Sequence, residues 1–149
     1  MQDEYCMNIA LEQAKIAFKK GDVPVGAVII MGNKVISKAY NRKNKEQNAI
    51  KHAEIIAIEK ACKKLRSWYL NDCILYVTME PCLMCCGAIL QSRIKRVVYG
   101  TKCNKFGFAG SIDNVLINNK NNHSVELQSG VCSEDCSMIL KEFFSDKRK

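Results

Sequence analysis

The pattern of apolar and polar residues along the chain indicates both helices and strands. Helical spacing, with apolar residues three or four positions apart, is clearest near the N-terminus and predicts helices at 4–20, 53–65, 82–92, 111–117 and about 133–145. Shorter stretches rich in β-branched and aromatic residues predict strands at 23–31, 34–40, 73–79, 96–100 and 125–127. Gly32-Asn33 separates the first two strands and predicts a hairpin turn, whereas 41–51 is polar and irregular.

This order of elements predicts an α/β fold. After the opening hairpin, helices alternate with short strands, so we expect a mixed five-stranded sheet with helices on both faces. The hairpin makes its two strands antiparallel, and strands joined by helices should be parallel. The sequence has no internal repeat, no low-complexity tract and no linker rich in Pro, Gly or Ser. We therefore expect one domain over residues 1–149.

Composition and charge suggest a basic cytoplasmic protein. The sequence is 48% hydrophobic, has a net charge of +8, and has no apolar run near the roughly 18–20 residues of a membrane span. Its opening residues contain two acids and follow an amphipathic helical pattern, so we expect no secretory signal, no membrane partner and a cytoplasmic location. The basic excess favours a polyanion such as nucleic acid. Because most of the 23 basic residues are lysine in an asparagine-rich sequence, biased coding composition is the alternative.

Two short motifs carry the candidate chemistry. His52 and Glu54 fall at the start of one predicted helix, and Cys82 and Cys85 fall at the start of the next. Both helix starts should lie at one edge of the sheet, where open α/β sheets bind ligands. The two cysteines share a helix face, and the positive end of the helix favours their thiolates. An imidazole and two thiolates make three ligands, which leaves a zinc ion one position for water. Glu54 would lie beside the metal and move that water's protons.

Each half of this pattern has an ordinary alternative. The nine cysteines are an odd number, unlike a secreted disulfide framework, and most lie in apolar patterns where they pack as small hydrophobic residues. A CxxC alone fits a redox pair, a structural half-site or two core cysteines, and a lone His-x-Glu is common. The combination is much rarer: HAE opens one helix, PCxxC opens another, and a strand lies between them. Together they predict a catalytic zinc.

The same motifs resemble the signature of the zinc nucleoside and nucleobase deaminases. Further segments occur in the order and at the spacings of the bacterial tRNA-specific adenosine deaminases over about residues 23–144: VPVGAVII, YNR, SRIKRVVYG, AGS, NH and KEFF. The resemblance implies a cytidine-deaminase-like three-layer α/β/α sandwich, a homodimer, and one Zn²⁺ in each subunit. It also implies the anticodon stem-loop of a tRNA as partner, with the wobble adenosine of an arginine tRNA converted to inosine.

The resemblance also assigns roles to residues around the metal. Asn41 would hydrogen-bond the flipped base, the Ala53 backbone would help to bind it, and Asn122, His123 and Phe144 would line the RNA loop. Other interpretations stay open, because Asn41 also suits a turn and 118–123 also suits a solvated loop. One of the phenylalanines at 143–144 should belong to the core, while the other stacks on a base. The basic residues at 147–149 either contact phosphates or remain in solvent.

One position departs from the family pattern. Cys103 stands where the family usually has an aspartate that contacts the RNA backbone beside the target. A thiol is a weak hydrogen-bond donor and acceptor. The departure therefore bears on the tightness or the sugar preference of RNA binding, and not on the zinc chemistry.

Two other functions share parts of these features. A small-molecule deaminase acting on guanine, cytosine or a free nucleoside would have the same zinc site. A zinc-stabilised RNA-binding protein without catalysis would have the same basic charge. The +8 charge favours RNA over a free base, and Glu54 favours catalysis because a structural site has no use for a carboxylate that is not a ligand.

Overall fold

The structure, a computed structural model, describes residues 2–147 and the side chains up to residue 145. The predicted phosphate contacts at 147–149 therefore lie outside the described side chains. In chain order the elements are α1 (Asp3–Lys19), β1 (Gly26–Met31), β2 (Lys34–Tyr40), α2 (Lys43–Glu46), α3 (Ala53–Leu65), β3 (Cys73–Met79), α4 (Leu83–Ser92), β4 (Arg96–Thr101), β5 (Glu126–Ser129) and α5 (Ser133–Lys147).

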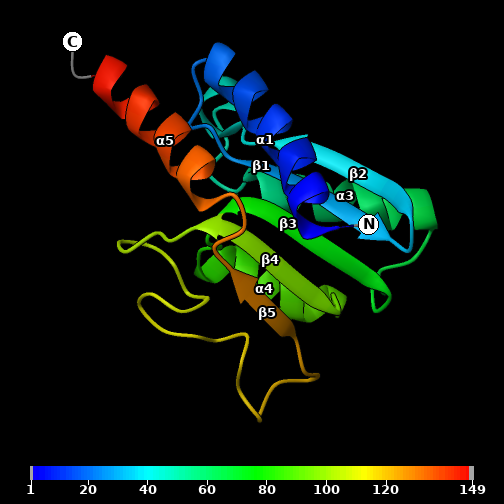
Figure 1. Cartoon of the computed structure of the whole chain (residues 1–149). Coiled ribbons are helices and arrows are strands. Elements are labelled where there is room, and N and C mark those ends of the chain that lie inside the picture. The colour runs from blue at the N-terminus through cyan, green and yellow to red at the C-terminus, as the bar shows by residue number, and fades with distance from the viewer. Residues whose placement is uncertain (1, 148–149) are drawn as a thin grey trace.

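A mixed five-stranded sheet forms the middle layer, with the order β2-β1-β3-β4-β5. β1 is antiparallel to both β2 and β3, and β3, β4 and β5 are parallel to one another. β2 and β3 therefore point the same way and are joined by α3, as predicted for strands connected by a helix. Figure 1 shows α1 and α5 together on one face of the sheet and α3 and α4 on the other. This arrangement confirms the predicted α/β/α sandwich.

The central strands bury both of their faces. In β1, Ala27 and Ile29 pack in the cluster beneath α3 and α4, whereas Val28 and Ile30 pack in the cluster beneath α1 and α5. Side chains of a strand alternate between the two faces of a sheet. A strand covered on both sides therefore carries a continuous apolar run, which is why 73–79 and 96–100 were recognisable.

The N-terminal end of α1 is fastened to the sheet by a charged contact. Arg96 of β4 donates from both of its terminal nitrogens to the two Asp3 oxygens, each at 2.8 Å, and the Tyr76 hydroxyl donates to Asp3 at 2.7 Å. The Arg96 hydrogen bond is the main reason that the pKa of Asp3 lies below its usual value. Asp3 also lies in the first turn of α1, where a negative charge is favourable.

Two connections differ from the prediction. The expected helix at 111–117 is wrong: this segment consists of turns, with an isolated bridge between Ala109 and Asn114. Its neighbouring N–H groups donate to a buried carboxylate, described below, instead of to carbonyl groups one turn back. Conversely, the irregular segment 41–51 contains the one-turn helix α2. There both oxygens of Asp22 accept hydrogen bonds, from the backbone N–H groups of Asn44 at 2.7 Å and Lys45 at 3.0 Å.

Two further expectations concern the chain as a whole. Residues 2–147 hold all nine cysteines, and none of them forms a disulfide. Among the described helices, none combines the length and the apolar character needed to cross a membrane.

Candidate metal centre and active site

The predicted ligands converge where two helices begin. His52 directly precedes α3 and Cys82 directly precedes α4, and both have extended backbone. Their carbonyl groups accept the first helical hydrogen bonds, from Ile56 at 3.1 Å and Cys86 at 2.9 Å. Cys85, which lies in the first turn of α4, is fully buried. The two helix starts thus hold an imidazole and two thiols together at the edge of the sheet.

The spacing of these three side chains fits a tetrahedral zinc ion. The Nδ1 atom of His52 lies 3.6 Å from the Cys82 Sγ and 3.6 Å from the Cys85 Sγ. Zinc binds imidazole nitrogen at about 2.0–2.1 Å and thiolate sulfur at about 2.3 Å, which at a tetrahedral angle separates N from S by about 3.6 Å. Their ligand atoms all lie within 4.8 Å of one another, the only such group of three His, Cys, Asp or Glu residues in the described part of the chain. The geometry and the donor chemistry both fit a metal ion.

The charges of the cluster also favour a cation. Hydrogen bonds lower the pKa of Cys82 to about 4. The hydrogen bond with the Cys85 side chain has the larger effect, and that with His52 adds to it. Cys85 is the donor beside that thiolate and is buried, so the pKa of Cys85 is raised. The hydrogen bond to Cys82 raises the pKa of His52. The negative charge of the group at neutral pH therefore lies on the Cys82 sulfur, which a divalent cation stabilises.

Glu54 supplies a carboxylate beside the ligands without being one of them. It lies in the first turn of α3 with only 4% of its surface exposed, and its side chain contacts Cys85. Burial raises the pKa of Glu54 to about 7. A carboxyl group that titrates near neutrality can both accept and return a proton at that pH.

A second buried glutamate, which the sequence reasoning missed, shapes the loop next to the site. Glu80 is 2% exposed and accepts hydrogen bonds from the N–H groups of Cys103 at 3.0 Å, Ala109 at 3.1 Å and Ser111 at 2.9 Å, and from the Ser111 hydroxyl. Gly107 lies so close to the Glu80 carboxylate that any side chain there would overlap it. The available signal was an acidic residue between a buried strand and the PCxxC motif.

Comparison with known proteins identifies the site's family. The sequence matches the MafB19-like deaminase family over residues 1–148. The tRNA-specific adenosine deaminase of Bacillus subtilis (strain 168) is 44% identical over 148 residues, which cover 99% of this chain and 92% of that protein. The chain belongs to the tRNA-specific adenosine deaminases.

Solved structures of deaminases share its fold. A structure from studies of A-to-I editing by tRNA:A34 deaminases at the wobble position of transfer RNA has a TM-score of 0.87 at 34% identity, covering 91% of this chain and 99% of that one. Guanine deaminase from Bacillus subtilis has a TM-score of 0.67 at 33% identity, covering 83% of each chain. The two structures are similarly identical to this chain in sequence, but the tRNA:A34 deaminase has the higher TM-score and covers more of the chain.

The two predicted base contacts lie at the end of β2 and at the start of α3. Asn41 donates from Nδ2 to the Val23 carbonyl at 3.2 Å and accepts from the Lys43 N–H at 3.1 Å, so its amide holds the end of β2. An amide carries a second N–H group, and base binding by Asn41 stays a prediction. Ala53 is the first residue of α3, next to His52, and its backbone role also stays a prediction.

The predicted RNA-loop contacts are spread more widely. Asn122 donates to the Leu90 carbonyl at 2.9 Å, and His123 lies 2.9 Å from the Ile94 carbonyl, so both are held at the C-terminal end of α4. A ten-residue helix is about 15 Å long, and the candidate ligands Cys82 and Cys85 lie at its other end. Their contact with RNA stays a prediction.

The C-terminal phenylalanines divide as predicted. Phe143 is 5% exposed and packs against Phe18 with ring centroids 5.8 Å apart, while Phe144 is 46% exposed. The core therefore takes Phe143 and leaves the ring of Phe144 on the surface, as stacking on a base requires. The stacking itself stays a prediction.

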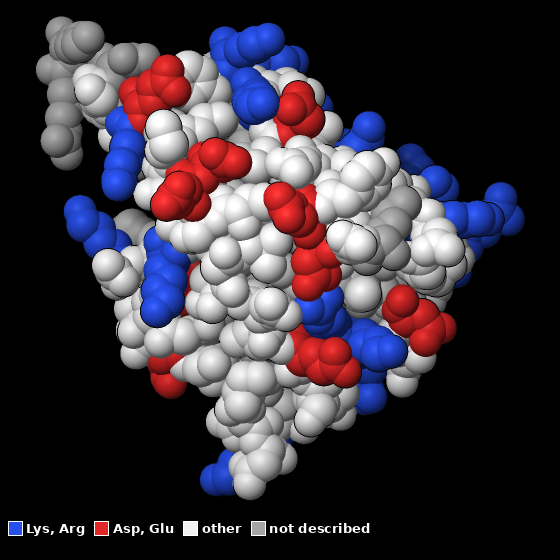
Figure 2. Space-filling view, in the orientation of Figure 1, with Lys and Arg blue, Asp and Glu red and all other residues white. Residues whose placement is uncertain are grey.

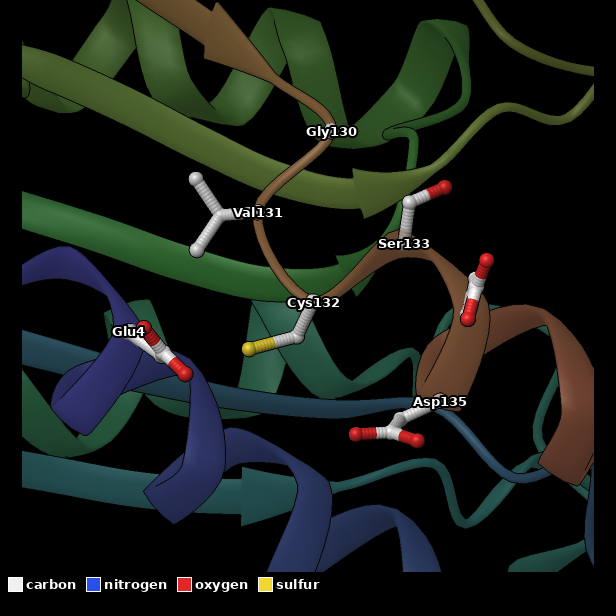
Figure 3. A pocket seen from close by; sticks show the side chains of 7 residues that line it. Glu4, Gly130, Val131, Cys132, Ser133 and Asp135 are labelled. Atoms are coloured by element: carbon white, nitrogen blue, oxygen red, sulfur yellow. The ribbon is translucent and has the colours of Figure 1, made fainter.

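A separate hollow between the N-terminal ends of α1 and α5 is unsuited to RNA. It has a volume of about 460 Å³, and Figure 3 shows Glu4 of α1 facing Cys132 and Asp135 beside the start of α5. Glu134 is the third acidic residue in its lining. Three carboxylates around one hollow repel a polyanion, so this hollow is not where the RNA backbone binds.

Proposed function

We propose that this deaminase converts the wobble adenosine in the anticodon loop of tRNA, that of an arginine tRNA, to inosine by zinc-dependent hydrolysis. The proposal includes one Zn²⁺ per subunit, a homodimer of single-domain subunits and a cytoplasmic location. The observation that carries it is the placement of Glu54 beside the His52, Cys82 and Cys85 group. A purely structural metal site has no use for a buried carboxylate that is not a ligand.

The reaction replaces the exocyclic amino group of adenosine with oxygen from water. A zinc ion held by His52, Cys82 and Cys85 would act as a Lewis acid that activates the water for hydrolysis. Glu54 takes a proton from the water at its carboxylate oxygen and passes it to the purine ring as the water oxygen bonds to C6. Glu54 then carries the second proton to the departing amino group. The C–N bond breaks, and inosine and ammonia are the products.

The environment of Glu54 suits both proton transfers. Burial raises its pKa to about 7. A group with a much lower pKa would not accept a proton at neutral pH, and one with a much higher pKa would not release it. The carboxyl group is also held in the first turn of α3, one residue after Ala53 and two after the ligand His52. It therefore stays within reach of a substrate bound at the ligands.

The predicted contacts belong to the same proposal. Asn41 and the Ala53 backbone would bind the flipped base, and Phe144 would stack on an RNA base near the site. Asn122 and His123, at the far end of α4, would meet the RNA beyond the target nucleotide. A guanine deaminase of similar sequence makes deamination of a free base the second candidate, but a free base needs neither a basic surface nor an exposed Phe144.

The experiment compares RNA with free bases in the presence of the purified, zinc-loaded protein. We expect inosine at the wobble position of tRNA, detected by sequencing of its cDNA, and no ammonia from free guanine, cytosine or adenosine. Glu54→Ala should keep its zinc and lose turnover. Conversion of free guanine without conversion of tRNA would instead support the second candidate, and unchanged turnover of Glu54→Ala would remove Glu54 from the mechanism.

A further inference from the structure

A group of cations surrounds Tyr40 where α1, β2 and α2 meet, and it has no part in the mechanism above. The Arg42 guanidinium lies over the Tyr40 ring, 4.6 Å from its centroid, and donates to the Tyr40 hydroxyl at 2.9 Å. The Lys20 Nζ lies 5.5 Å from the same ring centroid. We call Lys20, Tyr40, Arg42 and Lys45 the Tyr40 cluster.

The fold holds the two lysines of this cluster together. Lys20 follows the end of α1, and Asp22, two residues later, is 1% exposed. Both Asp22 oxygens accept backbone N–H groups from α2, including that of Lys45. The buried carboxylate thus binds α2 to the end of α1 through the main chain, and the lysine side chains extend to the surface. The positive charge of Lys20 lies near that of Lys45 and lowers the pKa of Lys45.

The cluster contains more positive than negative charge. Glu46 pairs with Arg42 at 3.3 Å, and the buried Asp22 faces the backbone of α2. Two lysines and one arginine therefore share one exposed carboxylate. Placing like charges side by side is unfavourable unless an anion lies between them. A phosphate group matches both the planar fork of Arg and the point charge of Lys.

The Tyr40 cluster lies next to the active site. Arg42 donates its backbone N–H to the carbonyl of Lys51 at 3.0 Å, and Lys51 directly precedes the ligand His52. Figure 2 shows Lys and Arg side chains gathered over the C-terminal end of α1, whereas acidic side chains lie across the middle of the same face. A polyanion on this side is therefore drawn to the rim next to the site.

We propose that Lys20, Arg42 and Lys45 form a phosphate-binding surface that holds the RNA backbone beside the target nucleotide. This proposal rests on the proposed function and adds a part of the RNA to it. Tyr40 is a positioning residue in this surface, because its ring and hydroxyl hold Arg42 and Lys20. None of these side chains takes part in proton transfer, so the surface acts on RNA binding and not on the chemical step.

The test uses the double variant K20A/K45A and an RNA anticodon stem-loop as substrate. Binding to single-stranded RNA through one phosphate contributes about 0.7 to the slope of log affinity against log salt, so two contacts contribute about 1.4. At 0.1 M salt we expect KM to rise about 25-fold, with the difference vanishing near 1 M. The value of kcat should stay within about twofold.

The matched control is K63A/K64A, which removes the same charge from the exposed last turn of α3, at the opposite end of that helix from His52. Its KM and salt dependence should equal those of the wild type. If K20A/K45A behaves like this control while the wild type edits RNA, the surface is misassigned. If the wild type edits no RNA at all, the proposed function itself fails, so the two failures are distinguishable.

Discussion

Replacing Glu80 with alanine should lower the stability of the protein, with its largest local effect in the loop beside the candidate metal site. The carboxylate accepts three backbone N–H groups and one hydroxyl, from Cys103, Ala109 and Ser111, in a buried place. Each hydrogen bond to a charged group contributes about 1.5–3 kcal/mol, and part of their sum is offset because the variant no longer buries a charge. We therefore expect Glu80→Ala to lower the free energy of unfolding by about 3–5 kcal/mol.

Two measurements test this value and its cause. At about 2–4 °C per kcal/mol for a chain of this size, the melting temperature should fall by about 6–20 °C. Hydrogen exchange should accelerate at the amides of Cys103, Ala109 and Ser111, because these are the groups that lose their acceptor. The control Glu142→Ala, at an exposed position on α5, should change stability by less than about 0.5 kcal/mol. A Glu80 variant that melts like this control with unchanged loop exchange would refute the reasoning.

Three further predictions concern the metal, the α1 contact and the exposed aromatic ring. Cys82→Ala removes a ligand, so zinc measured by mass spectrometry should be lost and affinity should fall by more than about 100-fold; full zinc retention would contradict the site. Asp3→Asn breaks the contact with Arg96 and should cost about 1–3 kcal/mol at pH 7. The pKa of Asp3 is lowered from 3.8 on folding, so its contribution is present above about pH 4 and is lost as the pH falls through the lowered value. The two unfolding curves should converge there, and a constant difference at low pH would contradict the linkage. Phe144→Ala should raise KM for RNA about tenfold with unchanged kcat, since stacking contributes about 1–3 kcal/mol; an unchanged KM would remove Phe144 from the RNA contacts.

Helices and strands whose formation depends on their own residues could be predicted from the sequence. The helix at 53–65 and the strands at 34–40 and 73–79 match the structure residue for residue, because periodicity and burial agree there. The meeting of His52, Cys82 and Cys85 was also predictable, since zinc chemistry requires particular donors at particular spacings whatever the rest of the fold. His52 and Cys82 even occupy the same kind of place, the residue before a helix.

The segments that the sequence did not predict correctly depend on residues far away in the chain. The one-turn helix α2 is too short for a periodic pattern, and it depends on Asp22, about twenty residues earlier. The wrong helix at 111–117 has local helical spacing, but Glu80, about thirty residues earlier, takes the N–H groups of Ala109 and Ser111. β5 was placed slightly early because it is a mostly exposed edge strand with little apolar pattern. A sequence pattern shows what a segment prefers, whereas these segments follow a distant partner.

The two buried glutamates near Cys82 differ in their hydrogen-bond partners and therefore in their pKa. Burial alone would raise the pKa of both. At Glu80, hydrogen bonds from Ser111, Cys103 and Ala109 outweigh burial and lower the pKa. At Glu54 burial dominates, and the pKa rises to about 7. A carboxylate that is fully hydrogen-bonded to the backbone is stable as an anion and has little reason to take up a proton. A buried carboxylate with few donors can gain and lose one near neutral pH, and so Glu54, rather than Glu80, is suited to carry protons between water and base.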